Sequence, residues 1–216
     1  MSSSKSFSQI IICLLIIIIA FLLGFYFYPQ MPPEMASHWN TQGEVNGYLS
    51  KFWALFLLPF LMVILFLLFL IIPEIDPLKK NIEKFRKFYD EFALLIIFFL
   101  FYIYVLTILW GLGLKFRINL FLAPLLAVLF YYLGVLMSKA KRNWFIGIRT
   151  PWTLSNEKVW QKTHQLGSKL FKCFAFFIIF SLFFKEGIFV WAILTYLAVT
   201  VLYLTVYSYF LFQKLK

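Results

Sequence analysis

The chain has 216 residues, of which 63% are hydrophobic and 22% aromatic, whereas only 13% carry a charge. Soluble domains are about half apolar and about a quarter charged, so this composition excludes an ordinary soluble enzyme. The formal net charge is +11, but the basic residues are dispersed between long apolar runs. That pattern indicates loops facing anionic lipid, and no direct binding of nucleic acid is expected.

Six apolar runs follow one another along the chain. Each is long enough to cross the roughly 30 Å core of a bilayer as a helix, except the fifth, which is short and is expected to begin earlier. The runs are Phe7–Tyr28, Phe52–Ile72, Phe92–Leu114, Ile118–Met137, Leu170–Phe184 and Ile188–Phe212. They predict an all-α, polytopic protein of the cell (plasma) membrane, with six transmembrane helices in a single domain over residues 1–216.

The loops between these runs alternate in charge. With the N-terminus placed in the cytoplasm, all but four of the 20 Lys and Arg residues fall in inner segments. The outer segments hold Lys51, Lys115, Arg117 and Lys185. Because cytoplasmic loops are enriched in Lys and Arg, this pattern predicts that both termini lie inside the cell.

The middles of the six runs contain no Asp, Glu, Lys, Arg or His. Ion-coupled pumps and many transporters place such groups in the membrane to move ions. Intramembrane proteases need His and carboxylate ligands or paired Asp residues there. We therefore expect neither catalysis nor a cofactor, and a transporter of small molecules or lipids is a less favoured alternative.

The first informative loop covers residues 29–51 and is predicted to lie outside the cell. Three prolines stiffen its start, Asn46-Gly47 is a turn signal, and Gly43 can supply a second reversal. The apolar side chains of Trp39 and Tyr48 with Val45 are expected to pack together. The loop is therefore predicted to be a compact, structured extracytoplasmic cap.

The same loop contains His38, Glu34 and Glu44, which could together bind a divalent metal. The favoured interpretation is a histidine that is hydrogen-bonded within the loop, and the metal site is the alternative.

The second informative loop covers residues 138–169 and is predicted to be cytoplasmic. From residue 155 it has the pattern of a helix, because Ser155 can cap its N-terminus and Glu157 suits the dipole of its first turn. Its polar stripe is Lys158, Lys162, Gln165 and Lys169, and its apolar stripe is Val159, Thr163, Leu166 and Leu170. We expect this amphipathic helix to lie in the membrane interface before it turns into the fifth span.

Residues 143–154, which precede this helix, are very apolar for a loop and are expected to tuck into the cytoplasmic end of the bundle. Arg149 stands among them and should be paired by backbone carbonyls, lipid phosphate or an acidic partner. A structural clamp is the favoured interpretation of Arg149, and a ligand contact is the alternative.

The second loop resembles the signature of the SdpI-like bacterial toxin-immunity membrane proteins, which have six helices. The residues that carry the resemblance lie between 143 and 171 and include Gly147, Arg149, Thr150, Pro151, Trp152, Thr153, Asn156, Trp160, His164 and Gly167. The first loop resembles the domain of unknown function that often precedes this signature, at Pro32, His38, Trp39, Gly43, Gly47, Tyr48, Ser50 and Lys51. The chain departs from that pattern at Pro33 and at Asn46.

The resemblance implies two functions. An outward part would neutralise a secreted antimicrobial peptide toxin at the membrane. A cytoplasmic part would capture a transcriptional repressor and so signal that the toxin is present. The expected partners are therefore membrane lipid, the peptide toxin and the repressor.

Our leading hypothesis is an immunity or receptor protein that acts by binding. The candidate binding residues of the outer loop are His38, Trp39, Asn40, Gly43, Gly47 and Tyr48. Those of the inner loop are Gly147, Arg149, Thr150, Pro151, Trp152, Asn156, Trp160 and His164. The alternative is a membrane enzyme or metal-dependent protein that uses Glu34, His38 and Glu44, or Arg149 and His164.

Overall fold

The computed structural model describes residues 2–184 and 186–215, and Lys185, used in the charge argument, lies outside them. The helices are α1 Ser2–Phe27, α2 Lys51–Ile75, α3 Lys79–Glu83, α4 Arg86–Gly111, α5 Ile118–Lys139, α6 Pro151–Ser155, α7 Glu157–Ser181 and α8 Glu186–Leu215. A short 3-10 turn, η1, covers Tyr28–Gln30, and two strands follow it, β1 Glu34–Trp39 and β2 Val45–Ser50.

Five of the described helices are long and apolar enough to cross a membrane, namely α1, α2, α4, α5 and α8. The prediction of a mostly helical, polytopic membrane protein is confirmed by this architecture. The predicted fifth span, Leu170–Phe184, falls largely in the second half of α7, whose first half is too polar to meet the same criterion.

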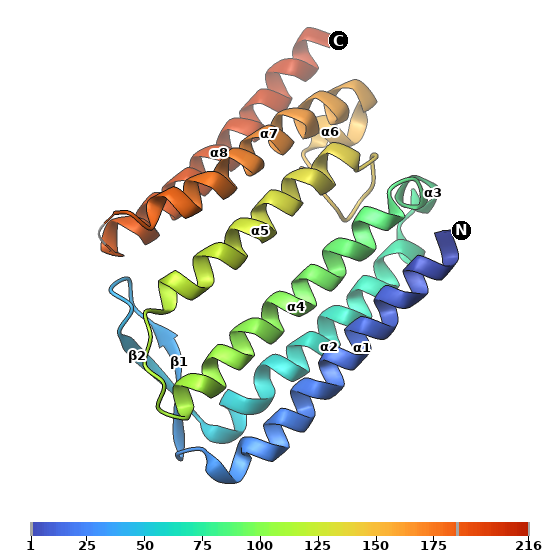
Figure 1. Ribbon diagram of the computed structural model, residues 1–216. Helices are drawn as coiled ribbons and strands as arrows, with labels where there is room; N and C mark the ends of the chain where they lie inside the picture. The colour runs from blue at the N-terminus through green and yellow to red at the C-terminus, as the bar shows by residue number, and fades with distance from the viewer. Residues whose placement is uncertain (1, 185, 216) are drawn as a thin grey trace.

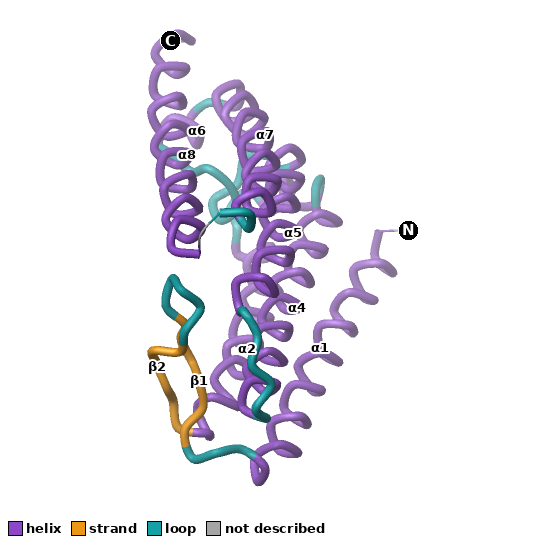
Figure 2. Tube along the Cα trace, turned by 60° about the vertical axis from the view of Figure 1, so that its left-hand side comes forward, coloured by secondary structure: helices purple, strands orange, loops and turns teal. Residues whose placement is uncertain are grey.

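The long helices run along one common direction (Figure 1). Helices α1, α2 and α4 pack against one another, α7 packs against both α5 and α8, and α4 joins the two groups through α5. The strands lie at one end of the helices, and α3, α6 and both marked chain ends lie at the other (Figure 1). Figure 2 shows the same separation of the strands from α6. We call these the hairpin end and the signature end.

Helix α7 differs from the prediction in its shape. Its amphipathic first half and the fifth apolar run form one unbroken helix, where the sequence predicted an interfacial helix that turns into a span. Buried residues recur at helical spacing across the junction, from Thr163 through Gly167 and Phe171 to Phe174. Because α5 and α8 cover this stripe on both sides of the junction, packing keeps α7 continuous.

Close approach of α5 and α7 depends on a glycine. A Cβ atom on Gly134 would lie 2.8 Å from the backbone oxygen of Ser168 and 2.9 Å from the side chain of Lys172. Small residues allow such backbone contacts between membrane helices. Helices α5 and α7 are therefore closely packed, and they support the loop that connects them.

Candidate functional site

The hairpin end is built on an antiparallel pair of strands, where the sequence predicted a compact cap. Glu34 pairs with Ser50 at its base, and Trp39 pairs with Val45 near its tip, with irregular register on either side of His38. Such bulges twist a strand pair and re-aim its side chains. The outer loop is thus an ordered hairpin.

The chain reverses at residues 40–44. The Asn40 side-chain oxygen accepts hydrogen bonds from the backbone N–H groups of Gln42, at 3.0 Å, and Glu44, at 2.9 Å. Gly43 has φ +78°, a conformation that favours glycine, so its predicted reversal agrees with the structure. The predicted turn at Asn46-Gly47 is wrong, because both residues lie within β2.

Buried methionines anchor the hairpin to the helices. Met31 and Met35 are buried, and a Cβ atom on Gly111 would lie 2.7 Å from the sulfur of Met31 and 2.8 Å from the methyl carbon of Met35. The ring of Trp39 also meets the ring of Trp110 edge-on, with centroids 5.5 Å apart. The hairpin is therefore held on the end of α4.

The predicted cluster of Trp39, Tyr48 and Val45 does not form as a unit. Trp39 and Val45 are cross-strand partners. Tyr48 instead pairs with Ala36, on the other side of the irregular register, and it is 61% exposed. Tyr48 is thus presented outward from an anchored strand.

The three candidate metal ligands of the outer loop are not brought together. His38 Nδ1 is hydrogen-bonded to the side-chain oxygen of Asn46, and a carboxylate oxygen of Glu44 accepts from the Asn40 amide at 3.1 Å. Glu34 lies at the opposite end of the strand pair. Within residues 2–184 and 186–215, no three His, Cys, Asp or Glu side chains gather closely enough to hold a metal ion. His38 is the histidine bonded within the loop that the sequence favoured.

At the signature end, Asn143 organises the loop that follows α5. Its side chain is fully buried and donates to the backbone oxygens of Lys141, at 2.8 Å, and Ile146, at 3.0 Å. Its side-chain oxygen accepts from the backbone N–H groups of Phe145 and Ile146. One buried side-chain amide thus fixes the backbone between residues 141 and 146 through four hydrogen bonds.

Asp76 ties this loop to the end of α2. It is buried, and its carboxylate accepts from the backbone N–H groups of Leu78, at 2.6 Å, and Trp144, at 2.8 Å. The Asn81 amide donates to the backbone oxygen of Arg142 at 2.9 Å. These bonds join the two helix groups at the signature end.

Gly147 and His164 meet where the loop crosses α7. Gly147 has φ +109°, and a Cβ atom there would lie 2.3 Å from Nε2 of His164. Nε2 accepts a hydrogen bond from the backbone N–H of Ile148 at 2.9 Å. Nδ1 lies 2.9 Å from the backbone oxygen of Trp160, so it carries the proton and donates it there. Both ring nitrogens are occupied, which leaves neither as a base or ligand for the alternative Arg149/His164 enzyme.

Burial lowers the pKa of His164 to about 4, from an ordinary value of 6.5. The unfolded chain therefore binds this proton at a higher pH than the folded protein does. We expect stability to be unaffected by this group above pH 6.5 and to fall by about 3 kcal/mol as the pH decreases from 6.5 to 4. Thermal unfolding in a nonionic detergent as a function of pH measures the effect. A His164→Gln variant should lack this part of the pH dependence, and an unchanged profile would contradict the assignment.

Thr150 and Thr153 fold the short helix α6. Thr150 Oγ1 accepts from the backbone N–H of Thr153 at 3.2 Å, and Thr153 Oγ1 accepts from that of Thr150 at 2.9 Å. This reciprocal cap is completed by Pro151 at the start of the helix. Thr150 Oγ1 also lies 3.0 Å from Ser208 Oγ, which attaches the loop to α8.

Asn156 caps α7, where the sequence predicted Ser155. Its side-chain oxygen accepts from the backbone N–H groups of Lys158, at 2.9 Å, and Val159, at 3.2 Å. Ser155 is instead the last residue of α6, and its hydroxyl donates to the backbone oxygen of Trp152. Because α6 was not predicted from the sequence, the predicted N-cap of α7 was one residue too early in the chain.

Trp160 lies at the centre of the signature end. It is fully buried, its indole N–H donates to the backbone oxygen of Ala140 at 3.0 Å, and its ring stacks on His164 with centroids 3.9 Å apart. It belongs to a buried cluster with Tyr89 of α4 and with Phe85, the residue just before that helix. Trp160 therefore links α4, α5 and α7.

Arg149 is an exposed residue of the motif. Its Nη1 donates to the backbone oxygen of Trp144 at 2.6 Å, which is the carbonyl clamp that the sequence favoured. No carboxylate in the described part of the chain forms an ion pair with it.

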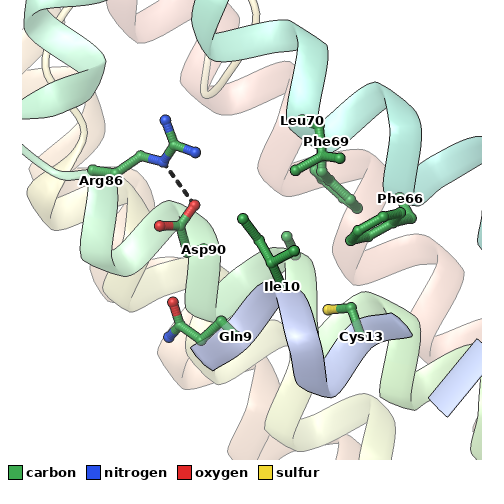
Figure 3. Close-up of a pocket in the computed structure, with 9 residues that line it drawn as sticks. Gln9, Ile10, Cys13, Phe66, Phe69, Leu70, Arg86 and Asp90 are labelled. Carbon is green, nitrogen blue, oxygen red and sulfur yellow. Dashed lines mark hydrogen bonds and ion pairs between the residues drawn. The ribbon is translucent and has the colours of Figure 1, made fainter. Parts of the chain in front are cut away.

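A small pocket lies among α1, α2 and α4 near the signature end (Figure 3). The ion pair of Arg86 with Asp90, at 2.8 Å, lies beside it. Its volume of about 20 Å³ holds roughly one water molecule, so it offers no room for a ligand.

Comparison with known proteins identifies both loops. The SdpI/YfhL protein family matches residues 139–208, and a domain of unknown function, DUF1648, matches residues 15–63. The immunity protein SdpI of Bacillus subtilis (strain 168) is 28% identical over 206 residues, which cover 95% of this chain and 97% of that protein. Residues 139–208 thus resemble the SdpI/YfhL family, and nearly the whole chain is similar to an immunity protein. No solved structure matches it.

The similarity to SdpI and the apolar helices together make this chain a multi-pass protein of the cell membrane. The SdpI/YfhL match begins at the end of α5 and includes the signature loop, α6, α7 and most of α8. The DUF1648 match includes half of α1, the hairpin and half of α2. Each motif therefore corresponds to one end of the molecule together with the helices that support it.

Sequence reasoning did not single out three residues that hold the SdpI/YfhL signature in place. They are Asp76, Asn143 and Ser208. Asp76 precedes Pro77, and its side chain accepts a hydrogen bond from the backbone N–H of Leu78. An Asp-Pro pair is a turn signal, and it could have identified Asp76 from the sequence. Ser208 lies in a helix with no local signal, because its partner Thr150 is far away in the sequence.

Proposed function

We propose that this chain is an immunity protein that protects its cell against a secreted antimicrobial peptide toxin by binding the toxin, with no bond chemistry. The observation that carries the proposal is the match to the immunity protein SdpI over nearly the whole of both chains. The occupied nitrogens of His164 and the dispersed carboxylates of the outer loop favour binding over catalysis.

The proposed orientation follows the distribution of charge. We propose that the second half of α7, from Leu170, crosses the membrane as the fifth of six spans, so that both termini and the signature end face the cytoplasm and the hairpin end faces outward. The common end of the two termini is consistent with an even number of spans (Figure 1).

The hairpin end supports a docking surface for an apolar peptide. Tyr48 is 61% exposed on a strand anchored to α4, and Phe52 and Trp53 follow it with large exposed rings. Aromatic side chains on a rigid support lose little entropy on binding and dominate many interfaces. A membrane-active peptide arriving along the lipid surface would meet these rings.

Two buried donors beside the hairpin tip offer further contacts. Trp39 Nε1 and Asn119 Nδ2 have no hydrogen-bond partner within the described residues. Asn119 lies beside the tip, 4.0 Å from the position of a Cβ atom on Gly43. Unsatisfied buried donors are costly, so a carbonyl oxygen supplied by a bound peptide would be favourable there.

The test is protection of a toxin-sensitive host by the expressed chain. We expect the wild type to raise the toxin concentration needed for killing. The Tyr48→Ala variant should lower this concentration about tenfold relative to the wild type, because it removes a central aromatic contact. Tyr203→Ala is the matched control, since Tyr203 is 50% exposed on α8 away from the hairpin. Membrane levels of all three proteins are measured by immunoblot. Unchanged killing in cells with the wild-type chain would overturn the immunity proposal.

We further propose that the signature end captures a cytoplasmic repressor when toxin is bound. Lys158, Lys162 and Lys169 are exposed on α7, and this basic stripe would suit an acidic partner surface. Co-purification of a repressor with the detergent-solubilised chain should increase after toxin treatment and be lost in a Lys158→Glu/Lys162→Glu variant. Equal recovery from all samples would contradict this part of the proposal.

A further inference from the structure

A cavity of about 350 Å³ opens at the signature end between the signature loop and helices α5, α7 and α8. This size lies in the range of small-molecule sites. Its lining comes from Met137 of α5, Phe171 of α7, Val201, Leu204 and Thr205 of α8, and Gly147, Ile148, Arg149 and Thr150 of the loop.

Arg149 supplies the charge of this cavity. Its one hydrogen bond within the described chain, from Nη1 to the Trp144 carbonyl, fixes the guanidinium at the loop. A guanidinium carries several N–H donors in a planar fork, and the others have no acceptor within the described residues. A cation held in this way matches a phosphate group, which can accept two parallel hydrogen bonds.

The rest of the lining is largely apolar. Met137, Phe171 and Leu204 are buried, and Val201 is 50% exposed at the cavity. Helix α8 ends and α7 begins at the signature end, so Val201 and Phe171 lie deeper along the helices than the loop that carries Arg149. The cavity therefore has a cationic mouth and an apolar interior, which is the chemistry of an anionic amphiphile.

We propose that this cavity binds one anionic phospholipid, with its phosphate on Arg149 and part of an acyl chain against Met137, Phe171 and Leu204. The depth order agrees with a bilayer, in which phosphates lie at the interface and acyl chains lie inward. A free phosphate ion would leave the apolar surface in contact with water. This proposal is independent of toxin binding at the hairpin end.

Native mass spectrometry of the full-length chain in a nonionic detergent tests the proposal, with phosphatidylglycerol, phosphatidylcholine or inorganic phosphate added. We expect one bound phosphatidylglycerol, about tenfold weaker binding of phosphatidylcholine, and no displacement of the lipid by inorganic phosphate. Equal binding of the two lipids, displacement by phosphate, or no retained lipid would each overturn it.

Two variants locate the site. Arg149→Gln should weaken phosphatidylglycerol binding about tenfold by removing the cation. Because Arg149 also holds the loop, Val201→Trp provides a second route: it fills the cavity without changing any charge and should reduce lipid retention to a similar degree. Val206→Trp is its matched control, since Val206 is 51% exposed on the same helix and does not line the cavity. Equal lipid retention by the two tryptophan variants would overturn the assignment.

Discussion

Gly147→Ala is expected to destabilise the folded protein by about 3 kcal/mol or more. The backbone of Gly147 has φ +109°, which L side chains rarely adopt, and the new Cβ atom would lie 2.3 Å from Nε2 of His164. His164 cannot move away without losing its bonds to Ile148 and Trp160. Thermal unfolding in a nonionic detergent, followed by near-ultraviolet circular dichroism, measures the loss.

Gly113→Ala is the matched control for this substitution. Gly113 has φ +95°, so alanine meets a similar backbone penalty of about 1–2 kcal/mol, but no atom lies within 4 Å of its Cβ position. The difference between the two variants isolates the collision with His164. Equal destabilisation of the two proteins would show that Gly147 is needed for its conformation alone.

Trp160→Ala should cost about 3–5 kcal/mol, the usual range for truncating a buried aromatic side chain. Trp160 is fully buried, and its loss would also remove the stack on His164 and leave the Ala140 carbonyl without its donor. Since the ring links α4, α5 and α7, we expect the contact between the two helix groups to loosen. Limited proteolysis should then cut the signature loop faster, and the thermal midpoint should fall.

The control for Trp160 lies in the loop between α5 and α6. Trp144 is 51% exposed, and its bonds to Asp76 and Arg149 use only backbone atoms, so Trp144→Ala removes an indole while keeping the loop connected. We expect its thermal midpoint to stay near that of the wild type. Similar losses in both variants would mean that the indole at position 160 is not the specific link between the helix groups.

The family signature is largely a set of residues that hold one another. The absence of a side chain at Gly147 leaves space for His164, and the backbone oxygen of Trp160 accepts a hydrogen bond from His164. Thr150 caps the helix that begins at Pro151. Arg149 is the member whose donors remain available to a ligand. A motif whose polar residues suggest a binding site is thus mainly a folding unit.

The sequence by itself predicted the membrane-spanning architecture. A bilayer demands about twenty apolar residues per helix regardless of how helices pack, so the long runs could be identified without any knowledge of neighbours. The chain reversal at Gly43 could also be predicted from the sequence, because it depends only on the conformational freedom of a single glycine. The residues of the two informative loops were identified through their resemblance to a family.

Only the tertiary structure decided how those loops are built. Val45 pairs with Trp39 whereas Tyr48 pairs with Ala36, because the loop pairs as strands, and α7 stays unbroken because α5 and α8 cover its buried stripe. Asp76 accepts from Trp144 and Thr150 bonds to Ser208 across long stretches of sequence. Such contacts depend on which segments meet in space, and local propensity and hydrophobic period carry no information about that.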